Sequence, residues 1–194
     1  MKPALVALFV LGLFAPIAGC DHALQQEVQS GRVPWLEPVM KGASSLGRPQ
    51  NVFAILLGVA VLGGPGGPVI VREVIAVLLP TNAIVEGMKF GIGRVRPDGD
   101  RKRSNSSMPS SHAANAFALA AWVGWRWRRA LFPALAAASL VAASRVYLNR
   151  HFVSDVLVGA AIGVACLWLA AHWFRGGGRV WVERGRLRSR SDVA

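Results

Sequence analysis

The chain has 194 residues, of which 53% are hydrophobic, and a formal net charge of +12 at pH 7. A soluble domain of this size rarely combines so apolar a composition with so many basic residues, so the pattern points to a membrane protein with polar loops. Its length fits one compact domain, and its two cysteines are too few for a disulfide framework.

Six apolar stretches are separated by polar turns: residues 3–19, 51–64, 69–90, 111–127, 130–146 and 152–174. About 20 helical residues cross a bilayer core, so the third and sixth are long enough alone and the others need polar flanks. The alternation typical of strands is absent, which leaves helices to satisfy the backbone in lipid. The sequence therefore predicts an all-α, polytopic membrane bundle of about six transmembrane helices, forming a single domain over residues 1–174.

The segments around this bundle have their own signatures. Residues 1–20 form either a retained first helix or a cleaved signal, since Ile17–Cys20 resembles a lipoprotein cleavage box. Residues 21–50 are half polar and are expected to lie along the membrane surface. Residues 175–194 form a basic tail that we expect to be flexible.

Two residue patterns predict how the helices sit in the bilayer. Trp122, Trp125 and Trp127 lie near the end of one apolar stretch, where indole rings are typical anchors at headgroup depth. Gly159 and Gly163 are one helical turn apart in the last stretch, a spacing that suits close helix packing.

Polar residues gather at particular helix ends, which is costly in a membrane protein and usually functional. The stretch 69–90 ends, and 111–127 begins, on one membrane face. The stretch 130–146 returns to that face, where 152–174 starts. These polar residues are Lys89, Arg94, Arg96, Ser110, Ser111, His112, Ser144, Arg145, His151 and Asp155. The topology therefore brings all of them to the same side.

The cations among these residues favour phosphate. Lys89, Arg96 and Arg145 carry permanent positive charge, and guanidinium groups match phosphate oxygens in a bidentate fashion. Ser110 and the amides that follow it would add donors at the positive end of a helix. Fixed donors of this kind stabilise the charge that develops during phosphoryl transfer.

Two histidines supply covalent and proton-transfer chemistry. His151 and Asp155 are four residues apart, so the carboxylate is expected to reach the ring, fix its tautomer and leave the other nitrogen as a nucleophile. His112 has no acidic residue at helical spacing and suits a general acid for the leaving oxygen, then a base for water.

At these positions the sequence resembles the type 2 phosphatidic acid phosphatase superfamily of membrane lipid phosphatases. The resemblance rests on three motifs: Lys89 with Arg96-Pro97 after six residues, Pro109-Ser110-Ser111-His112, and Ser144-Arg145 with His151 and Asp155. Each motif alone is weak. All three occur in order at helix ends, and this makes a chance match very rare.

The resemblance implies His151 as the nucleophile, Asp155 as its partner and His112 as the acid and base. It also implies phosphate binding by a set of side chains, with no metal or other cofactor: Lys89, Arg96, Ser110, Ser111 and Arg145. Ser111 departs from the family pattern, which usually has Gly there. We expect activity to survive this change, with altered rate or substrate choice.

Two charged residues near the motifs have open roles. Arg94 lies within the variable span of the first motif; of two roles, a contact with phosphate or a place on the surface, we expect the second. Glu86 lies one turn before Lys89, and it either pairs with that lysine or only neutralises charge within the bundle.

The predicted activity is hydrolysis of a lipid phosphate or isoprenoid diphosphate through a phosphohistidine. Undecaprenyl diphosphate, phosphatidylglycerophosphate, phosphatidic acid and lipid A are all candidate substrates. A lipid phosphotransferase would use the same residues. A transporter or flippase would bind anions without turnover, and it would leave the spacing of His151 and Asp155 unexplained. A soluble vanadate-dependent haloperoxidase shares the motifs but not the apolar spans.

Location follows from the charges and spans. The partners expected are a membrane lipid and the bilayer, with no nucleic acid. Once the phosphate-binding cations are set aside, the remaining basic residues favour a cytoplasmic tail. The sequence thus predicts an integral protein of the bacterial inner membrane, with its active site facing the periplasm.

Overall fold

The computed structural model describes residues 20–100 and 105–176, and every regular element in these two ranges is helical. The helices are residues 20–30, α2 (Leu36–Leu46), α3 (Pro49–Leu62), α4 (Gly67–Ile92), α5 (Ser111–Arg126), α6 (Leu131–Tyr147) and α7 (Val153–Gly176). The all-α prediction is confirmed, and the last five apolar stretches correspond to α3–α7. The first stretch, and residues 177–194 of the tail, lie outside the described residues.

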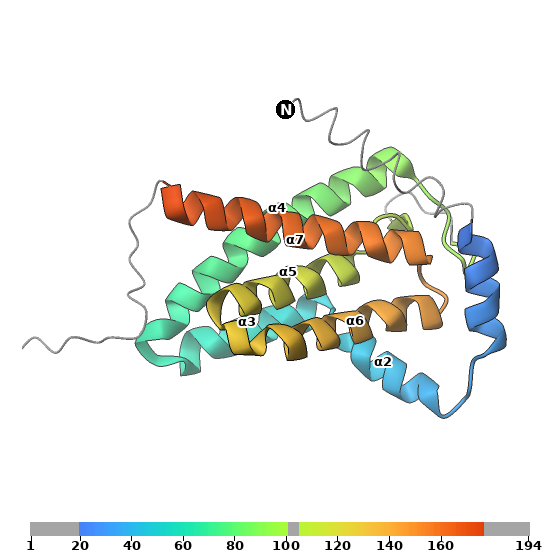
Figure 1. Cartoon of the computed structure of the whole chain (residues 1–194), viewed down its shortest axis with the longest axis horizontal. Coiled ribbons are helices and arrows are strands. Elements are labelled where there is room, and N and C mark those ends of the chain that lie inside the picture. The colour runs from blue at the N-terminus through green and yellow to red at the C-terminus, as the bar shows by residue number, and fades with distance from the viewer. Residues whose placement is uncertain (1–19, 101–104, 177–194) are drawn as a thin grey trace, which may run out of the picture.

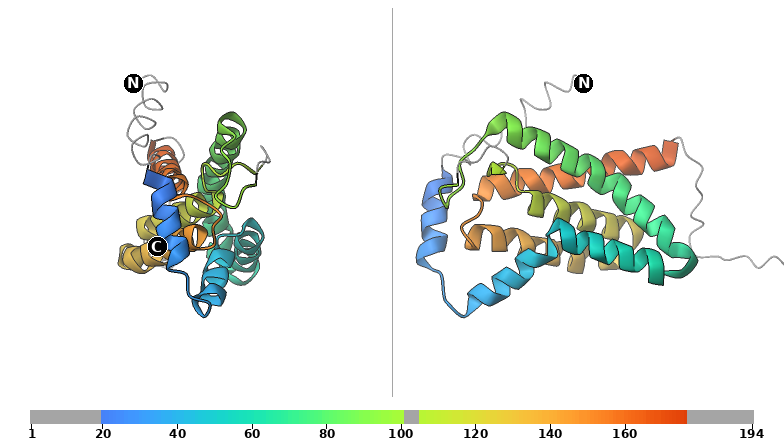
Figure 2. Two further views of the ribbon diagram at one scale, coloured as in Figure 1. Left: turned by 90° about the vertical axis from the view of Figure 1, so that its right-hand side faces the viewer. Right: turned by 180° about the vertical axis from the view of Figure 1, so that it is seen from behind.

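Helix α5 lies at the centre of the bundle, where it packs against α4, α6 and α7 (Figure 1). Helix α2 packs against α6, and α3 packs against α4. The helix at residues 20–30 lies across one end of the bundle, beside the end of α6 and the start of α7, as Figure 1 and the right-hand view of Figure 2 show. This is also the end at which α4 finishes and α5 begins.

The contact between α5 and α7 depends on two glycines. A Cβ atom on Gly159 would lie 2.5 Å from the carbonyl oxygen of Ser110, and one on Gly163 would lie 2.2 Å from that of Ala114. Real carbon atoms do not approach backbone oxygen so closely, so only glycine permits this helix separation. The predicted close packing is confirmed, and it fixes the start of α5 against the first turns of α7.

The bundle is apolar outside and partly polar inside, as expected in lipid. Leu79 and Phe132 are 70% and 79% exposed, whereas Glu73 is buried and accepts a hydrogen bond from Trp122 Nε1 at 3.3 Å. The prediction that Trp122 anchors the headgroup region is therefore wrong, because its ring is inside the bundle. Trp127 has an exposed ring, as an anchor would.

Three described helical segments are long and apolar enough to cross a membrane: Gly64–Ile92, Arg128–Tyr147 and Val153–Trp173. Leu36–Leu46 and Gln50–Leu62 together form a further candidate, bent by 55°. Helix α5 has 16 residues and is about 24 Å long, which is less than a bilayer core. Residues 20–100 and 105–176 thus contain three or four candidate spans of the six expected.

Candidate active site

Four helix ends meet at the end of the bundle that the helix at residues 20–30 covers. Gly93, with φ of +61°, ends α4 in the left-handed conformation that glycine adopts without strain. Ser110 caps α5, and its backbone N–H donates to the carbonyl oxygen of Asp155 at 3.0 Å. The second and third sequence motifs are thereby joined through the backbone.

The His151 ring is held by a backbone carbonyl. Its Nδ1 lies 2.7 Å from the carbonyl oxygen of Ser107, and the side chain is 2% exposed. A carbonyl oxygen only accepts hydrogen bonds, so Nδ1 must carry the proton and Nε2 keeps a free lone pair. Burial lowers the pKa of His151 below its ordinary value, against an opposing effect of Asp155. The ring is thus neutral, is oriented by Ser107 and has an unprotonated Nε2.

Asp155 does not hold the ring in the way that the sequence predicts. Its Oδ2 lies 3.8 Å from His151 Nδ1, which is too far for a hydrogen bond. The carboxylate instead accepts hydrogen bonds from the Ser107 hydroxyl and from Phe152 N–H, the latter at 2.8 Å. Asp155 remains close enough to stabilise positive charge on the imidazole, but Ser107 sets the tautomer.

Arg94 completes the surroundings of Asp155, and the expected surface role is wrong. Its Nη1 donates to Asp155 Oδ1 at 2.8 Å and to Ser154 Oγ at 2.7 Å. Its Nη2 donates to Asp21 Oδ2 at 2.9 Å. Asp21 is fully buried and also accepts from the backbone N–H of Ser154 at 3.0 Å. The helix at residues 20–30 is therefore tied to the start of α7 through a charged network.

Lys89 is paired at the end of α4. Its Nζ lies 2.7 Å from Glu86 Oε1 and 2.6 Å from Ser111 Oγ. The first of the two alternatives for Glu86, pairing with Lys89, is the observed one. Ser111 uses its side chain, which the usual glycine lacks, to hold the lysine across the junction between α4 and α5.

The two arginines of the predicted phosphate site are held differently. Arg96 donates from Nε and Nη2 to the backbone and side-chain oxygens of Asn105, at 2.8 Å and 2.6 Å. Arg145 donates from Nη1 to Ser44 Oγ at 2.6 Å, while its buried Nε has no hydrogen-bond partner among the described residues. A buried guanidinium N–H without a partner is a donor available to an anion.

His112 lies at the same end as His151. The guanidinium groups of Arg145, Arg48 and Arg96 are close enough to act electrostatically on its ring. A Cβ atom on Gly47 would lie 3.1 Å from its Cδ2, so the corner between α2 and α3 passes directly beside the ring. The structure therefore brings both imidazoles to one rim of the bundle, together with the predicted cations.

Four residues of this region carry no motif and were not predicted from the sequence. Ser107 contacts the His151 ring and Asp21 pairs with Arg94, while Ser44 and Arg48 come from the α2–α3 corner. A spacing pattern does not reveal them, because they belong to loops or to distant helices. No group of three or more His, Cys, Asp or Glu side chains in residues 20–100 and 105–176 has the arrangement of a metal site.

Comparison with known proteins agrees with this geometry. Residues 70–179 match the PAP2 superfamily. The chain is 30% identical over 192 residues to phosphatidylglycerophosphatase B of Bacillus subtilis, covering 87% of this chain and 92% of that protein. It is also 36% identical over 156 residues to the lipid A 1-phosphatase of Porphyromonas gingivalis. That match covers 76% of this chain and spans 30% of the length of the relative.

The fold leads to the same class. The crystal structure of a transmembrane PAP2-type phosphatidylglycerolphosphate phosphatase from Bacillus subtilis superposes with a TM-score of 0.73 at 25% identity. The superposition covers 93% of this chain and 99% of the other. The chain therefore belongs to the PAP2 superfamily of membrane lipid phosphate phosphatases.

Proposed function

We propose that this protein cleaves a phosphate from a membrane lipid by way of a phosphohistidine on His151. The observation that carries the proposal is the hydrogen bond from His151 Nδ1 to the Ser107 carbonyl, which leaves Nε2 free at the rim where the cations gather. A neutral, oriented imidazole beside phosphate-binding charges is what nucleophilic phosphoryl transfer requires.

The first step forms a bond between His151 Nε2 and phosphorus and breaks the bond to the lipid oxygen. His112 donates a proton to that leaving oxygen, so the lipid departs as a neutral alcohol. The phosphorylated ring then carries positive charge, which the Asp155 carboxylate at 3.8 Å stabilises. Lys89, Arg96 and Arg145 neutralise the charge on the phosphoryl oxygens.

The second step regenerates the enzyme. Water attacks phosphorus, its proton passes to His112, and the phosphorus–nitrogen bond breaks to release inorganic phosphate. His151 returns to the neutral form with its Nδ1 proton still on the Ser107 carbonyl. His112 thus acts as acid in the first step and as base in the second.

The substrate we propose is a lipid phosphate held at the outer leaflet, with its chains between helices. Relatives named for phosphatidylglycerophosphate and lipid A support a phospholipid or glycolipid monoester. Basic residues at the far end of the bundle, Arg72, Arg126, Arg128 and Arg129, support a periplasmic active site by the positive-inside rule. We also propose that residues 1–174 form the single six-helix domain expected from the sequence.

The test is a phosphate-release assay of purified full-length protein in detergent, with a panel of lipid phosphates. We expect release by the wild type, loss of more than about a thousandfold of activity in His151→Ala, and inhibition by vanadate, which mimics pentavalent phosphorus. Rapid quenching in alkali, in which a phosphorus–nitrogen bond survives, with a radiolabelled substrate should trap phosphate on the wild-type protein alone. Equal turnover by wild type and His151→Ala would overturn the assignment of the nucleophile.

A further inference from the structure

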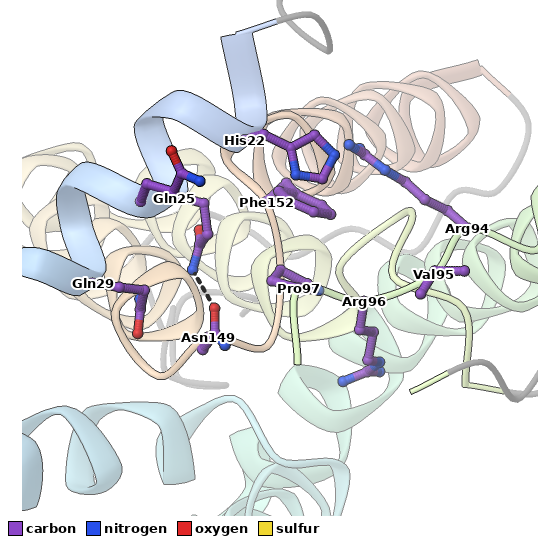
Figure 3. A pocket seen from close by; sticks show the side chains of 10 residues that line it. His22, Gln25, Gln29, Arg94, Val95, Arg96, Pro97, Asn149 and Phe152 are labelled. Atoms are coloured by element: carbon purple, nitrogen blue, oxygen red, sulfur yellow. Dashed lines mark hydrogen bonds between the residues drawn. The ribbon is translucent and has the colours of Figure 1, made fainter. Parts of the chain in front are cut away.

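A polar cavity of about 480 Å³ lies between the helix at residues 20–30 and the loop that follows α4 (Figure 3). It adjoins the proposed phosphate site, because Arg96 forms part of its wall and Phe152 follows the nucleophile directly. Its lining consists of His22, Gln25, Gln26, Gln29, Arg94, Val95, Arg96, Pro97, Asn149 and Phe152. Four of these ten side chains are neutral amides, and none is a carboxylate.

The amide of Gln25 has one possible orientation. Its Nε2 lies 3.0 Å from the Val146 carbonyl oxygen and 2.8 Å from Asn149 Oδ1. The Val146 carbonyl can only accept, so the nitrogen must face it and Oε1 must point elsewhere. Gln25 is 6% exposed, and its Oε1 has no hydrogen-bond partner in the described part of the chain. The bond to Asn149 fixes that side chain, which lines the cavity, to the helix at residues 20–30.

The positive charges of the wall are largely occupied. Both terminal nitrogens of Arg94 bind carboxylates, those of Asp155 and Asp21, so that its charge is compensated. Arg96 donates from Nε and Nη2 to Asn105, so only part of its guanidinium group can bind an anion in the cavity. The Gln29 amide is also occupied, since its Nε2 donates to the carbonyls of Val146 and Tyr147 and its Oε1 accepts from Arg32. Gln26 and Asn149 are the amides left for neutral polar groups, and they offer little to a second phosphate.

We infer that this cavity binds the hydroxyl-bearing part of the lipid headgroup, a glycerol or a sugar ring adjacent to the scissile phosphate. Neutral amides both donate to and accept from hydroxyl groups. Because Arg96 lines the cavity and is also a proposed phosphate-binding residue, a hydroxyl group in the cavity would lie beside the reacting phosphate. The inference rests on the proposed function and extends it to substrate choice. It predicts preference for hydroxylated headgroups over phosphatidic acid or an isoprenoid diphosphate.

The test compares kcat/KM of the full-length protein for three lipids: phosphatidylglycerophosphate, lipid A bearing a 1-phosphate, and phosphatidic acid. The variants are Gln26→Leu, on an exposed position of the cavity wall, and Asn149→Gly, which preserves the backbone at its φ of +59°. Glu27→Ala, exposed on the same helix and outside the cavity wall, is the matched control.

We expect each cavity variant to lower kcat/KM about fivefold to tenfold for one hydroxylated lipid, as loss of one or two neutral hydrogen bonds would. Turnover of phosphatidic acid should stay within about twofold of wild type, and the control should match wild type on every lipid. The lipid that responds identifies the headgroup as glycerol or sugar.

Two other results would each overturn the inference. Equal changes in kcat/KM for all three lipids, or no change for any, would show that the cavity does not bind the headgroup. The proposed phosphatase function would still hold. A wild-type protein that hydrolyses none of the three would remove the proposed function and this inference together.

Discussion

At the scale of single residues, Ser107 makes two separate contacts beside His151, the proposed nucleophile. Its carbonyl oxygen fixes the His151 ring, and its hydroxyl binds the carboxylate of Asp155. Orientation and charge stabilisation, which one aspartate performs in a simple triad, are thereby divided between two residues. The carboxylate can then stabilise the positive charge of the phosphorylated ring, while the Nδ1 proton stays bonded to the Ser107 carbonyl.

Arg94 should be essential for the position of Asp155. Arg94→Gln leaves two buried carboxylates, Asp155 and Asp21, without their shared cation, and we expect the free energy of unfolding to fall by about 3 kcal/mol. We also expect kcat to fall at least about tenfold, because Asp155 would shift from its place near His151. Arg94→Lys retains charge but loses the two-nitrogen geometry and should be intermediate.

The measurements are thermal unfolding in detergent and phosphate release at saturating substrate. A glutamine variant with wild-type kcat would show that Asp155 does not need the guanidinium for catalysis.

The pH profile should reflect the lowered pKa of His151. Because burial favours the neutral ring, the nucleophile stays unprotonated below its ordinary pKa of about 6.5, and the acid limb of kcat/KM should lie below that pH. Asp155 raises the pKa of His151, so Asp155→Asn should move the limb to still lower pH while reducing the rate. Steady-state kinetics between about pH 4 and 9 would check both shifts, and a limb that moves upward in Asp155→Asn would contradict this account.

Spacing was enough to predict that the motif residues lie together at one end of the bundle. The motif residues from Lys89 to Asp155 all lie at the ends of helices whose apolar lengths set the topology, so their convergence follows from the chain itself. The contact of His151 with Ser107 does not, because a backbone carbonyl leaves no mark in a sequence. The contact between Arg94 and Asp21 joins residues 73 positions apart and has no local signal.

At the scale of elements, the packing of α7 against α5 determines the relative positions of the proposed catalytic residues. Gly159 touches the carbonyl of Ser110, the residue that caps α5 and bonds to the backbone of Asp155. A change in the separation of these helices would therefore move His112 relative to His151. The pair of glycines in the sequence predicted the close contact, but not that one of them lies against the active-site cap.

Gly163→Ala should weaken the packing of α7 against α5. The added methyl group would lie 2.2 Å from the Ala114 carbonyl oxygen, so the helices must separate, and we expect a loss of about 1–3 kcal/mol in stability. Gly58→Ala in α3 is the control, since a Cβ there meets nothing within 4 Å and alanine favours the helix. Thermal unfolding in detergent would compare the two, and equal midpoints would show that the α5–α7 contact can relax.

Residues 21–50 were the least predictable element. They were expected along the membrane surface, and they fold into the helix at residues 20–30 and α2, the latter joined to α3 at a bend. Mixed polarity is shared by surface helices and by helices that bury polar side chains against a site. Gln25 illustrates the second case, since its amide is buried on the carbonyl of Val146.

At the scale of the whole molecule, the two ends of the bundle differ in the use of charge. The catalytic end pairs many of its cations with Glu86, Asp21, Asp98 and Asp155. The opposite end carries the basic residues Arg128 and Arg129, which are exposed. This asymmetry could be read from the sequence once the phosphate-binding cations had been identified.

Cysteine labelling should show the orientation in the membrane. The background carries Cys20→Ser and Cys166→Ala. In cells with a permeabilised outer membrane and an intact inner membrane, we expect Ser30→Cys to react with a membrane-impermeant thiol reagent. Arg129→Cys should react only after the inner membrane is permeabilised, because it lies in the connection between α5 and α6, at the other end. The reverse pattern would place the active site in the cytoplasm.

The buried position of Asp21 also constrains how this protein can be recombined. Its carboxylate accepts hydrogen bonds from Arg94 in the loop after α4 and from Ser154 at the start of α7. Three separate stretches of chain are thus joined in one buried polar network. A chimera that takes its first thirty or so residues from a relative would inherit a working catalytic centre only if all three partners were exchanged as a set.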